Sequence, residues 1–432
     1  MTKNLTKFIL LFLTALLFSN CAATLYDQGR SLLDDGQYLQ AIAIFKEELK
    51  TNPYNYQALR DLGIAELKNN DLQNAEVSLL KAKVIKPGDD ETIFYLGMLS
   101  EKLGDYDEAI DYYKKCLSLK SLSGDVEGKI EGRIQIISQK KMEQEIKTTL
   151  QNEESLSQEP VPHNTVAVLY FQNLGTNKEM DVLQRGLAEM LITDLSKVKD
   201  LKVVERVRLQ KLLDEMKLSS SEAFDQQSAP RLGRLMKAER LVKGTYLSMD
   251  DNTFRVDAGF IGTQDGSLQQ VKNVSGSLEE YFKLQKELVF NIVDQMGITL
   301  SDQEREAIQI IPTESYLAFV AYSKGLDQED KGNYQEAAEY YQEAITIDPS
   351  FKIAKVKLNE VQNIEQASTN FSSVENDFRS PAMDLSTTMD RLIEGSANLT
   401  GEMVLGRDDR NPNNSAGFGR GVKVEFELIV PR

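Results

Sequence analysis

The stretch LKVVERVRLQKLLDEMKL, residues 201–218, joins a strand pattern directly to a helix pattern. LKVV predicts a buried strand. Apolar side chains then recur at i, i+3, i+4 and i+7, which is one face of a helix; they are Leu209, Leu212, Leu213 and Met216. Enzymes often place a phosphate loop or a nucleophile at such a strand-to-helix turn. Here the turn is Glu205-Arg206, with no Gly, Ser, Cys or His, so it indicates assembly and not catalysis.

Two interpretations of this unit stay open. In the first, the apolar face of 208–218 covers a sheet, and Glu205 and Arg206 form an ion pair at the end of the strand. In the second, the helix and its preceding turn form a contact with a partner or with another copy of the chain.

The residues on either side extend the pattern into an α/β domain. Strands are predicted at 165–171, 201–206, 240–250 and 253–266, and helices at 183–198, 208–218, 229–239 and 277–297. Asp250-Asp251-Asn252 is a hairpin signal between the last two strands. The domain would have about 140 residues, a normal size for one folding unit.

Five stretches of this region resemble the CsgG family of curli secretion lipoproteins. They are VAVLYFQNLG, GLAEMLITDLSKV, LKVVERVRLQKLLDEMKL, LGRLMKAERLVKGTY and FRVDAGFIGTQDG. The resemblance covers about Thr165 to Thr299, under a third of the chain. The amino-terminal domain of TolB and the activator lipoproteins of penicillin-binding proteins are similar at a greater distance. The resemblance implies a CsgG-like α/β fold and a role in envelope assembly or secretion-related complexes.

The CsgG family includes a secretion channel, so a channel subunit in the outer membrane is the alternative function. A pore of that type needs extra amphipathic strands between the core strands, with side chains alternating toward lipid. Between Leu247 and Phe254 there is room for a turn and nothing longer. We therefore expect a domain that does not form the channel.

The region before this domain is built from internal repeats. A glycine, an alanine and a large apolar residue recur every 34 residues; they are Gly29, Gly63 and Gly97, then Ala41, Ala75 and Ala109, then Phe45, Leu79 and Tyr113. Pro53 and Pro87 share an offset at which the third copy has Ser121. This period resembles tetratricopeptide repeats, in which small residues let two helices approach and a large residue fills the space between them. A fourth copy places Gly325, Ala337, Tyr341, Ala344 and Pro349 at the same offsets.

Tetratricopeptide repeats bind partners through a groove lined by the first helix of each repeat. The resemblance places six residues on that face: Tyr26, Arg30, Arg60, Ile64, Phe94 and Met98. This mixture suits an extended peptide or a helix. The alternative is that these residues pack against the protein's own neighbouring domain.

The first residues have the pattern of a secretory signal. Lys3 and Lys7 precede an apolar run from Phe8 to Phe18, and Cys21 follows. The run is too short to span a membrane, and LFSNC resembles a lipobox, although Phe18 and Asn20 depart from its common form. We expect acyl chains on Cys21 to fix the mature protein to a membrane surface. A plain cleaved signal and an uncleaved anchor are the alternatives.

Composition limits the other functions. The formal charge of −17 over 432 residues disfavours nucleic acid as a partner. Cys116 occupies a small-residue position of its repeat and is expected to be buried, and His163 is expected to be a solvated linker residue. The charged stretch 327–333 lacks the carboxylate spacing of a calcium loop, because Lys331 stands where a ligand should be. We predict no catalytic residues, no metal site and no cofactor.

The predicted organisation is multidomain, α and α/β. It has a signal at 1–21, three repeats with a capping helix at 22–150, a linker at 151–164 and the CsgG-like domain at 165–305. A fourth repeat with a capping helix at 314–365 and a flexible tail at 366–432 follow, and Val422 to Val430 alternate as a strand. The expected function is a lipid-anchored scaffold of the bacterial envelope, in the outer membrane and facing the periplasm. It would bind an envelope protein or peptide, and self-association stays open.

Overall fold

The computed structural model describes residues 24–119, 122–156, 161–218, 228–249 and 253–379. Cys21 and the predicted strand at 422–430 therefore lie outside the described residues. The described residues up to 375 belong to one compact unit, Met1–Glu375, and those from 376 to 379 belong to a second.

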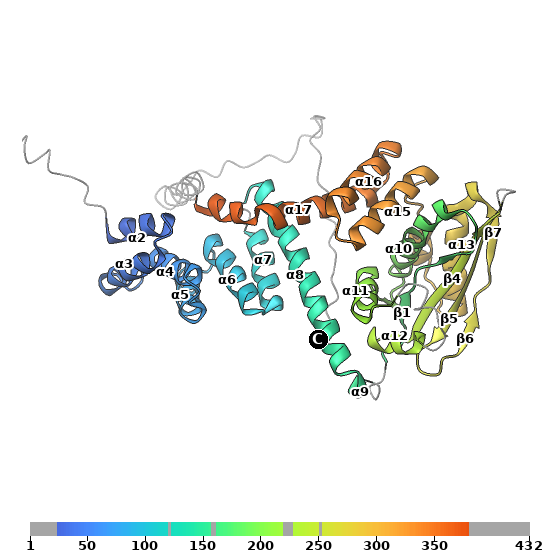
Figure 1. Ribbon diagram of the computed structural model, residues 1–432, viewed down its shortest axis with the longest axis horizontal. Coiled ribbons are helices and arrows are strands. Elements are labelled where there is room, and N and C mark those ends of the chain that lie inside the picture. The colour runs from blue at the N-terminus through green and yellow to red at the C-terminus, as the bar shows by residue number, and fades with distance from the viewer. Residues whose placement is uncertain (1–23, 120–121, 157–160, 219–227, 250–252, 380–432) are drawn as a thin grey trace, which may run out of the picture. The chain divides into compact units, whose positions relative to one another are not determined.

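The first part of the chain is three pairs of antiparallel helices (Figure 1). The pairs are α2 (Leu25–Asp34) with α3 (Tyr38–Thr51), α4 (Tyr56–Lys68) with α5 (Leu72–Ile85), and α6 (Asp90–Leu103) with α7 (Tyr106–Ser118). A Cβ atom on Gly63 would lie 2.6 Å from the side chain of Leu79, and one on Gly97 would lie 2.9 Å from the ring of Tyr113. The predicted role of the repeating glycines, close approach of two helices, is confirmed.

A long helix follows the three pairs. Helix α8 runs from Gly124 to Gln151, and the short α9 covers Glu153–Leu156 within the predicted linker. Val126, Ile130 and Ile137 on α8 are buried. The polar helix predicted as a cap is therefore present, and it has an apolar stripe.

The middle of the chain forms a mixed sheet with the order β3-β1-β4-β5-β6. These strands are β1 (Thr165–Val168), β3 (Lys202–Val203), β4 (Arg240–Ser248), β5 (Thr253–Gly262) and β6 (Leu268–Gln270). Strand β1 is parallel to β3 and to β4, and β4 and β5 form the predicted antiparallel hairpin. Two further strands, β2 (Gln172–Asn173) and β7 (Val274–Ser277), pair with β4 and β5. The sequence pattern did not predict β2, β6 and β7.

Helices cover both faces of this sheet (Figure 1). Val166 and Val168 join a core with α10 (Leu183–Leu195) and α13 (Tyr281–Gln295). Ala167 and Leu169 point the other way, toward α11 (Arg206–Met216) and α12 (Ala229–Leu235). The alternation follows from the two-residue period of a strand. The predicted apolar face of α11 therefore covers the sheet, through Leu209, Leu212 and Leu213.

The fourth repeat follows the sheet. After α14 (Asp302–Gln309), α15 (Tyr316–Asp330) and α16 (Tyr334–Ile347) form its helix pair, with Gly325 set against Tyr341. Phe319 and Tyr322 on α15 share the core cluster that holds Leu187 and Leu191 of α10. The fourth repeat is thus packed directly on one face of the middle domain.

The last described helix corrects the sequence analysis. A capping helix ending at 365 and a flexible tail from 366 were expected, but α17 runs from Lys352 to Arg379. Ile364, Ala367 and Val374 are buried, and with half-buried Phe371 they form a stripe at spacings of three, four and three residues. The intervening Ser, Thr and Asn residues conceal this stripe in the sequence.

Candidate partner-binding surface

The first helices of the three repeats share a buried network of charges. Asp61 on α4 accepts hydrogen bonds from Tyr26 Oη at 3.0 Å, Arg30 Nη1 at 3.0 Å and Arg60 Nε at 2.9 Å. The Arg60 Nη1 atom lies 2.8 Å from the carboxylate of Glu91 on α6. The network therefore links α2, α4 and α6, and we call the faces of these helices that carry it the first-helix surface.

Three carboxylates share two guanidinium groups in this network, because Asp89 also lies 3.6 Å from Arg60. Burial alone would raise the pKa of Asp61, but Arg60 and Arg30 outweigh it and hold that pKa below its usual value. Burial, opposed by Arg60 and Arg30 and aided by the carboxylates of Asp61 and Asp89, raises the pKa of Glu91 to about 7. One Glu91 oxygen has no hydrogen-bond partner. The raised pKa lets Glu91 take up a proton as the pH falls through about 7, and that proton relieves the excess negative charge.

The six predicted groove residues lie together on these helices, with different exposure. Arg60, Ile64 and Phe94 are buried, and Tyr26, Arg30 and Met98 are half-buried. Their assignment to a partner stays a prediction.

Sequence reasoning missed Asp61, Glu91, Lys68 and Tyr95 on the same surface. A signal was present, because Asp27, Asp61 and Tyr95 lie 34 residues apart, and such a register position recurs on the same side of each first helix.

The carboxyl-terminal half of α17 lies against the first-helix surface. The ring centroid of Phe371 is 5.7 Å from that of Phe94 and 6.0 Å from that of Tyr113, and the guanidinium of Arg133 lies 4.7 Å from the Phe371 centroid. The Glu375 carboxylate forms an ion pair with Lys68 and accepts a hydrogen bond of 3.3 Å from Tyr95 Oη. Part of the surface therefore holds a helix of the same chain.

Glycines in α8 let α17 cross closely. A Cβ on Gly132 would lie 2.0 Å from the backbone oxygen of Asn363, and one on Gly128 would lie 2.8 Å from its side chain. Asn363 Nδ2 donates to Glu131 at 3.0 Å, and Lys129 Nζ donates to Ser373 Oγ at 2.9 Å. The crossing fixes where α17 meets the repeats.

A second buried network begins at Arg206, where the turn after strand β3 enters helix α11. Its side chain is 2% exposed; Nε lies 2.8 Å from Glu189 on α10, and the guanidinium also pairs with Asp330 and Glu329 at the end of α15. One of the two interpretations included an ion pair between Glu205 and Arg206; the structure instead pairs Arg206 with these three carboxylates. Arg206 therefore binds the middle domain to the fourth repeat.

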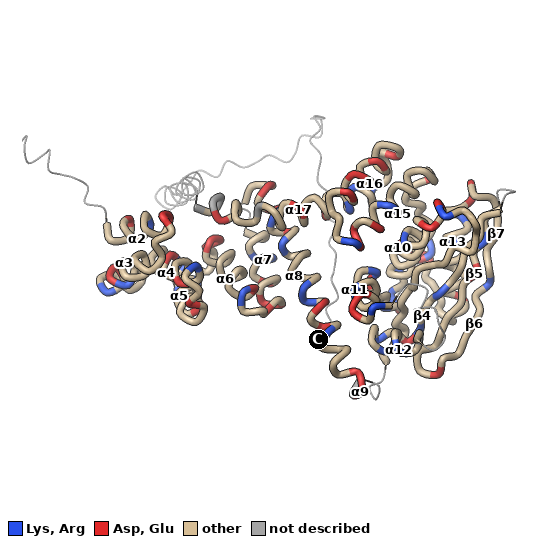
Figure 2. The backbone as a smooth tube through the Cα atoms, viewed as in Figure 1, with Lys and Arg blue, Asp and Glu red and all other residues tan. Residues whose placement is uncertain are grey.

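The outer face of α11 also contacts the same chain. Lys211 lies 2.6 Å from Glu143, and Arg208 lies 3.0 Å from Glu145, both on α8. Charges of both signs lie along α8 and α11 (Figure 2). The predicted partner contact of this helix is thus, at these positions, an intramolecular one.

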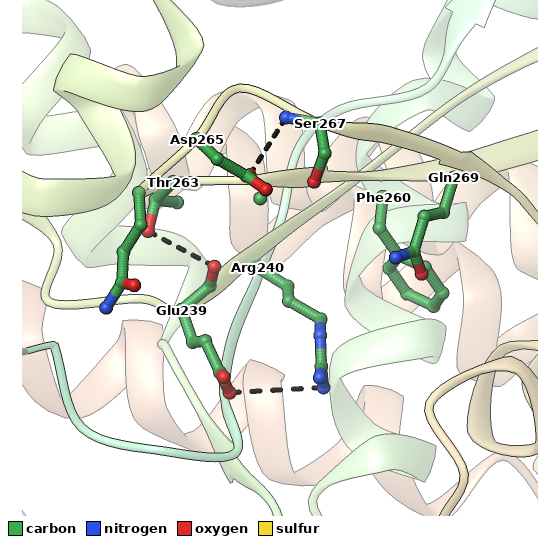
Figure 3. Close-up of a pocket in the computed structure, with 9 residues that line it drawn as sticks. Glu239, Arg240, Phe260, Thr263, Asp265, Ser267 and Gln269 are labelled. Carbon is green, nitrogen blue, oxygen red and sulfur yellow. Dashed lines mark hydrogen bonds and ion pairs between the residues drawn. The ribbon is translucent and has the colours of Figure 1, made fainter.

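A polar cavity of about 240 Å³ lies where β4 begins and β5 ends (Figure 3). Thr263 Oγ1 donates to the backbone oxygens of Ala238 and Glu239, at 2.8 Å and 3.1 Å, and Asp265 accepts from the Ser267 amide at 3.0 Å. Glu239 and Arg240 pair at 3.9 Å. These contacts fix the β5–β6 turn against the start of β4, which is a structural role.

Other residues singled out by sequence have ordinary surroundings. Cys116 is buried, and burial raises the pKa of its thiol to about 12. His163 has an exposed side chain with Nδ1 3.4 Å from Glu239. Within the described ranges, no group of three or more His, Cys, Asp or Glu residues could hold a metal ion. None of the described helices combines the length and apolar character needed to cross a membrane.

Both the helical repeats and the α/β domain match known protein families. Residues 148–277 match the family model of the curli production assembly/transport component CsgG, and residues 26–90, 91–121 and 318–351 match tetratricopeptide repeat models. The chain therefore contains tetratricopeptide repeats and a CsgG-like domain. Such repeats typically bind proteins, the CsgG-like family is associated with the bacterial envelope, and both families are generally non-catalytic.

Individual relatives are distant. "Putative adenylate cyclase 3" of Rhizobium meliloti is 24% identical over 214 residues, which are 48% of this chain and 34% of that protein. Anaphase-promoting complex subunit 3 of Schizosaccharomyces pombe is 27% identical over 22% of this chain and 14% of its own length. The chain thus spans about a third or less of these relatives. Among solved structures, the LpoB C-terminal domain from Salmonella enterica has a TM-score of 0.22 at 14% identity, over 32% of this chain and 94% of that one.

Proposed function

We propose that the chain is a non-catalytic, lipid-anchored scaffold of the bacterial envelope. In this account its repeats bind a protein partner, and its CsgG-like domain joins an envelope assembly or a secretion-related complex. Acyl chains on Cys21 hold it at the outer membrane, facing the periplasm.

The observation that carries the proposal is the helix held on the first-helix surface. Phe371 packs among Phe94, Tyr113 and Arg133, and Glu375 pairs with Lys68. Aromatic side chains and paired charges are the groups on which helix recognition depends. A surface that holds one amphipathic helix in this way has the chemistry to hold another.

The Arg206 network fixes the CsgG-like domain to the fourth repeat. Arg206 and Arg185 both pair with Asp330, Arg185 at 2.8 Å, and Lys357 at the start of α17 lies 3.1 Å from Glu329. Buried charges held by several partners are costly to separate. The fourth repeat would therefore stay fixed to the CsgG-like domain when a partner binds.

The anchor is tested by the mass of the mature amino terminus in a membrane fraction, with Cys21→Ala beside it. A diacyl or triacyl adduct on Cys21, lost together with membrane association in Cys21→Ala, is the expected result. An unmodified amino terminus in the soluble fraction would contradict the anchor. Ring-shaped oligomers with membrane conductance would instead favour the channel alternative.

A further inference from the structure

Helix α17 differs from an ordinary capping helix because its carboxyl-terminal end packs on other repeats. Its first turns belong to the fourth repeat, where Phe351 and Ala354 are buried and Lys357 pairs with Glu329. Its later turns leave that repeat, cross α8 at Gly132 and reach the first-helix surface. One helix thus connects the fourth repeat with the first three.

The contacts at the end of α17 define a recognition pattern. Phe371 supplies an aromatic ring to a pocket of two rings and a guanidinium, and Glu375 supplies a carboxylate to an ammonium and a phenol. The two residues are four apart, so they lie on one helical face, one turn from each other. On any helix docked in this register, Lys68 and Tyr95 would meet the carboxylate. The pocket of two rings and a guanidinium would meet the aromatic ring.

We propose that α17 occupies the partner site in the unbound protein, and that the partner is an amphipathic helix with an aromatic residue and a carboxylate four positions apart. This inference rests on the proposed function, because an external helix must take the place of α17. A ligand that binds the surface must then compete with a segment tethered to it, whose effective concentration is high. In wild type, only the molecules whose α17 has left the surface have a free site. When the tethered contacts are lost, every molecule has a free site, and the affinity for an added helix rises by the reciprocal of the wild-type free fraction.

The probe is a fluorescein-labelled peptide of residues 357–375, titrated by anisotropy into the full chain. Full-length Phe371→Ala/Glu375→Lys is expected to bind this peptide about tenfold or more tightly than wild type, since its own helix no longer competes. A peptide with the same two substitutions should lose binding to that variant. Equal affinity of wild type and variant, or no binding by either, would overturn the proposal.

Matched controls keep the result specific. Gln366→Lys/Ser372→Ala changes two exposed positions of α17 and should leave peptide affinity at the wild-type value. Circular dichroism checks that each chain keeps its helical content. If the double variant loses structure, Glu375→Lys alone, which leaves the Phe371 ring in place, must still bind the peptide more tightly than wild type; otherwise the proposal is wrong.

The peptide titration and the proposed function can fail separately. Suppose the double variant binds the peptide more tightly than wild type, but no protein from envelope extract is retained by the first-helix surface. The proposed partner role is then wrong, while the competition between α17 and the added peptide is supported. If a partner is retained through Lys68 but the peptide affinities do not differ, α17 is a structural brace and the partner has other chemistry. Sedimentation of wild type as a dimer that Phe371→Ala/Glu375→Lys converts to a monomer would overturn competition within one chain, since a second copy would then supply the helix.

Discussion

Arg206, in the strand-to-helix turn of the CsgG-like domain, forms a buried ion pair with Asp330, in the last turn of α15. The two residues are 124 positions apart in the chain. The turn has no Gly, Ser, Cys or His, and this contact gives it a structural role. Its charged residue holds the domain to a repeat that follows much later in the sequence.

Replacing Arg206 by Ala should destabilise the protein strongly. Glu189, Glu329 and Asp330 would lose their shared partner in a buried site, and removal of one member of a buried ion pair costs about 3–5 kcal/mol. Urea unfolding measures the change. Arg208→Ala, two residues away on the same helix, breaks a more exposed pair with Glu145 and should cost about 0–1 kcal/mol. Equal losses in both variants would contradict the role given to Arg206.

Replacing Gly132 by Ala should disturb the crossing of α8 and α17. The added Cβ would lie 2.0 Å from the backbone oxygen of Asn363, so one helix must move. Overpacking of this kind costs about 1–3 kcal/mol. The fall in thermal stability should come with faster hydrogen exchange in α17. Gly124→Ala, at a site with nothing within 4 Å of the new atom, should be close to neutral.

The raised pKa of Glu91, about 7, predicts a pH effect on stability. The folded chain binds a proton at Glu91 that the unfolded chain releases near pH 4.5, so between these values the folded state holds more protons. The contribution of Glu91 to the free energy of unfolding therefore falls as pH rises from 4.5 to 7. The groups that face it are Arg30, Arg60, Asp61 and Asp89.

Glu91→Gln should remove that contribution. Relative to wild type, the variant should gain stability between pH 5 and pH 8, by an amount of the order of 1 kcal/mol for each unit of pKa shift. Parallel urea unfolding curves at the two pH values measure the difference. A wild type and variant whose stabilities differ by the same amount at both pH values would show that Glu91 does not titrate in this range.

Cys116 should be inert in the folded protein. Its thiol is buried and its pKa is raised to about 12, and the thiolate is the reactive form. In a Cys21→Ala background, a thiol reagent at pH 8 should label Cys116 after unfolding and not before. Ser118→Cys in the same background, at an exposed site of the same helix, should react at once. Fast labelling of folded Cys116 would contradict the packing of α7.

Local periodicity predicted most of the secondary structure. The glycines at 29, 63, 97 and 325 mark helix pairs because the contact of each pair lies within one repeat. The hairpin of β4 and β5 was predictable because its turn is short. Strand β6 was not, since its three residues are all exposed and so leave no alternating pattern.

The candidate surface was predicted less completely. The repeat register gave Arg60 and Phe94, but Asp61 and Glu91 gain their roles from charges on other helices, Arg30 and Arg60 respectively. The partners of Arg206 and Phe371 are set by how distant segments pack, which no local spacing encodes. The lipid on Cys21, the strand at 422–430 and self-association stay predictions.

The most direct test of the account is capture of a partner from cross-linked bacterial envelopes by the full chain. We compare wild type with Lys68→Glu, which reverses the charge that meets Glu375, and with Lys115→Glu, an equal charge change at an exposed position of α7. The account predicts an envelope protein that wild type and Lys115→Glu retain and Lys68→Glu loses. Retention of the same proteins by all three chains, or of none by wild type, would contradict it.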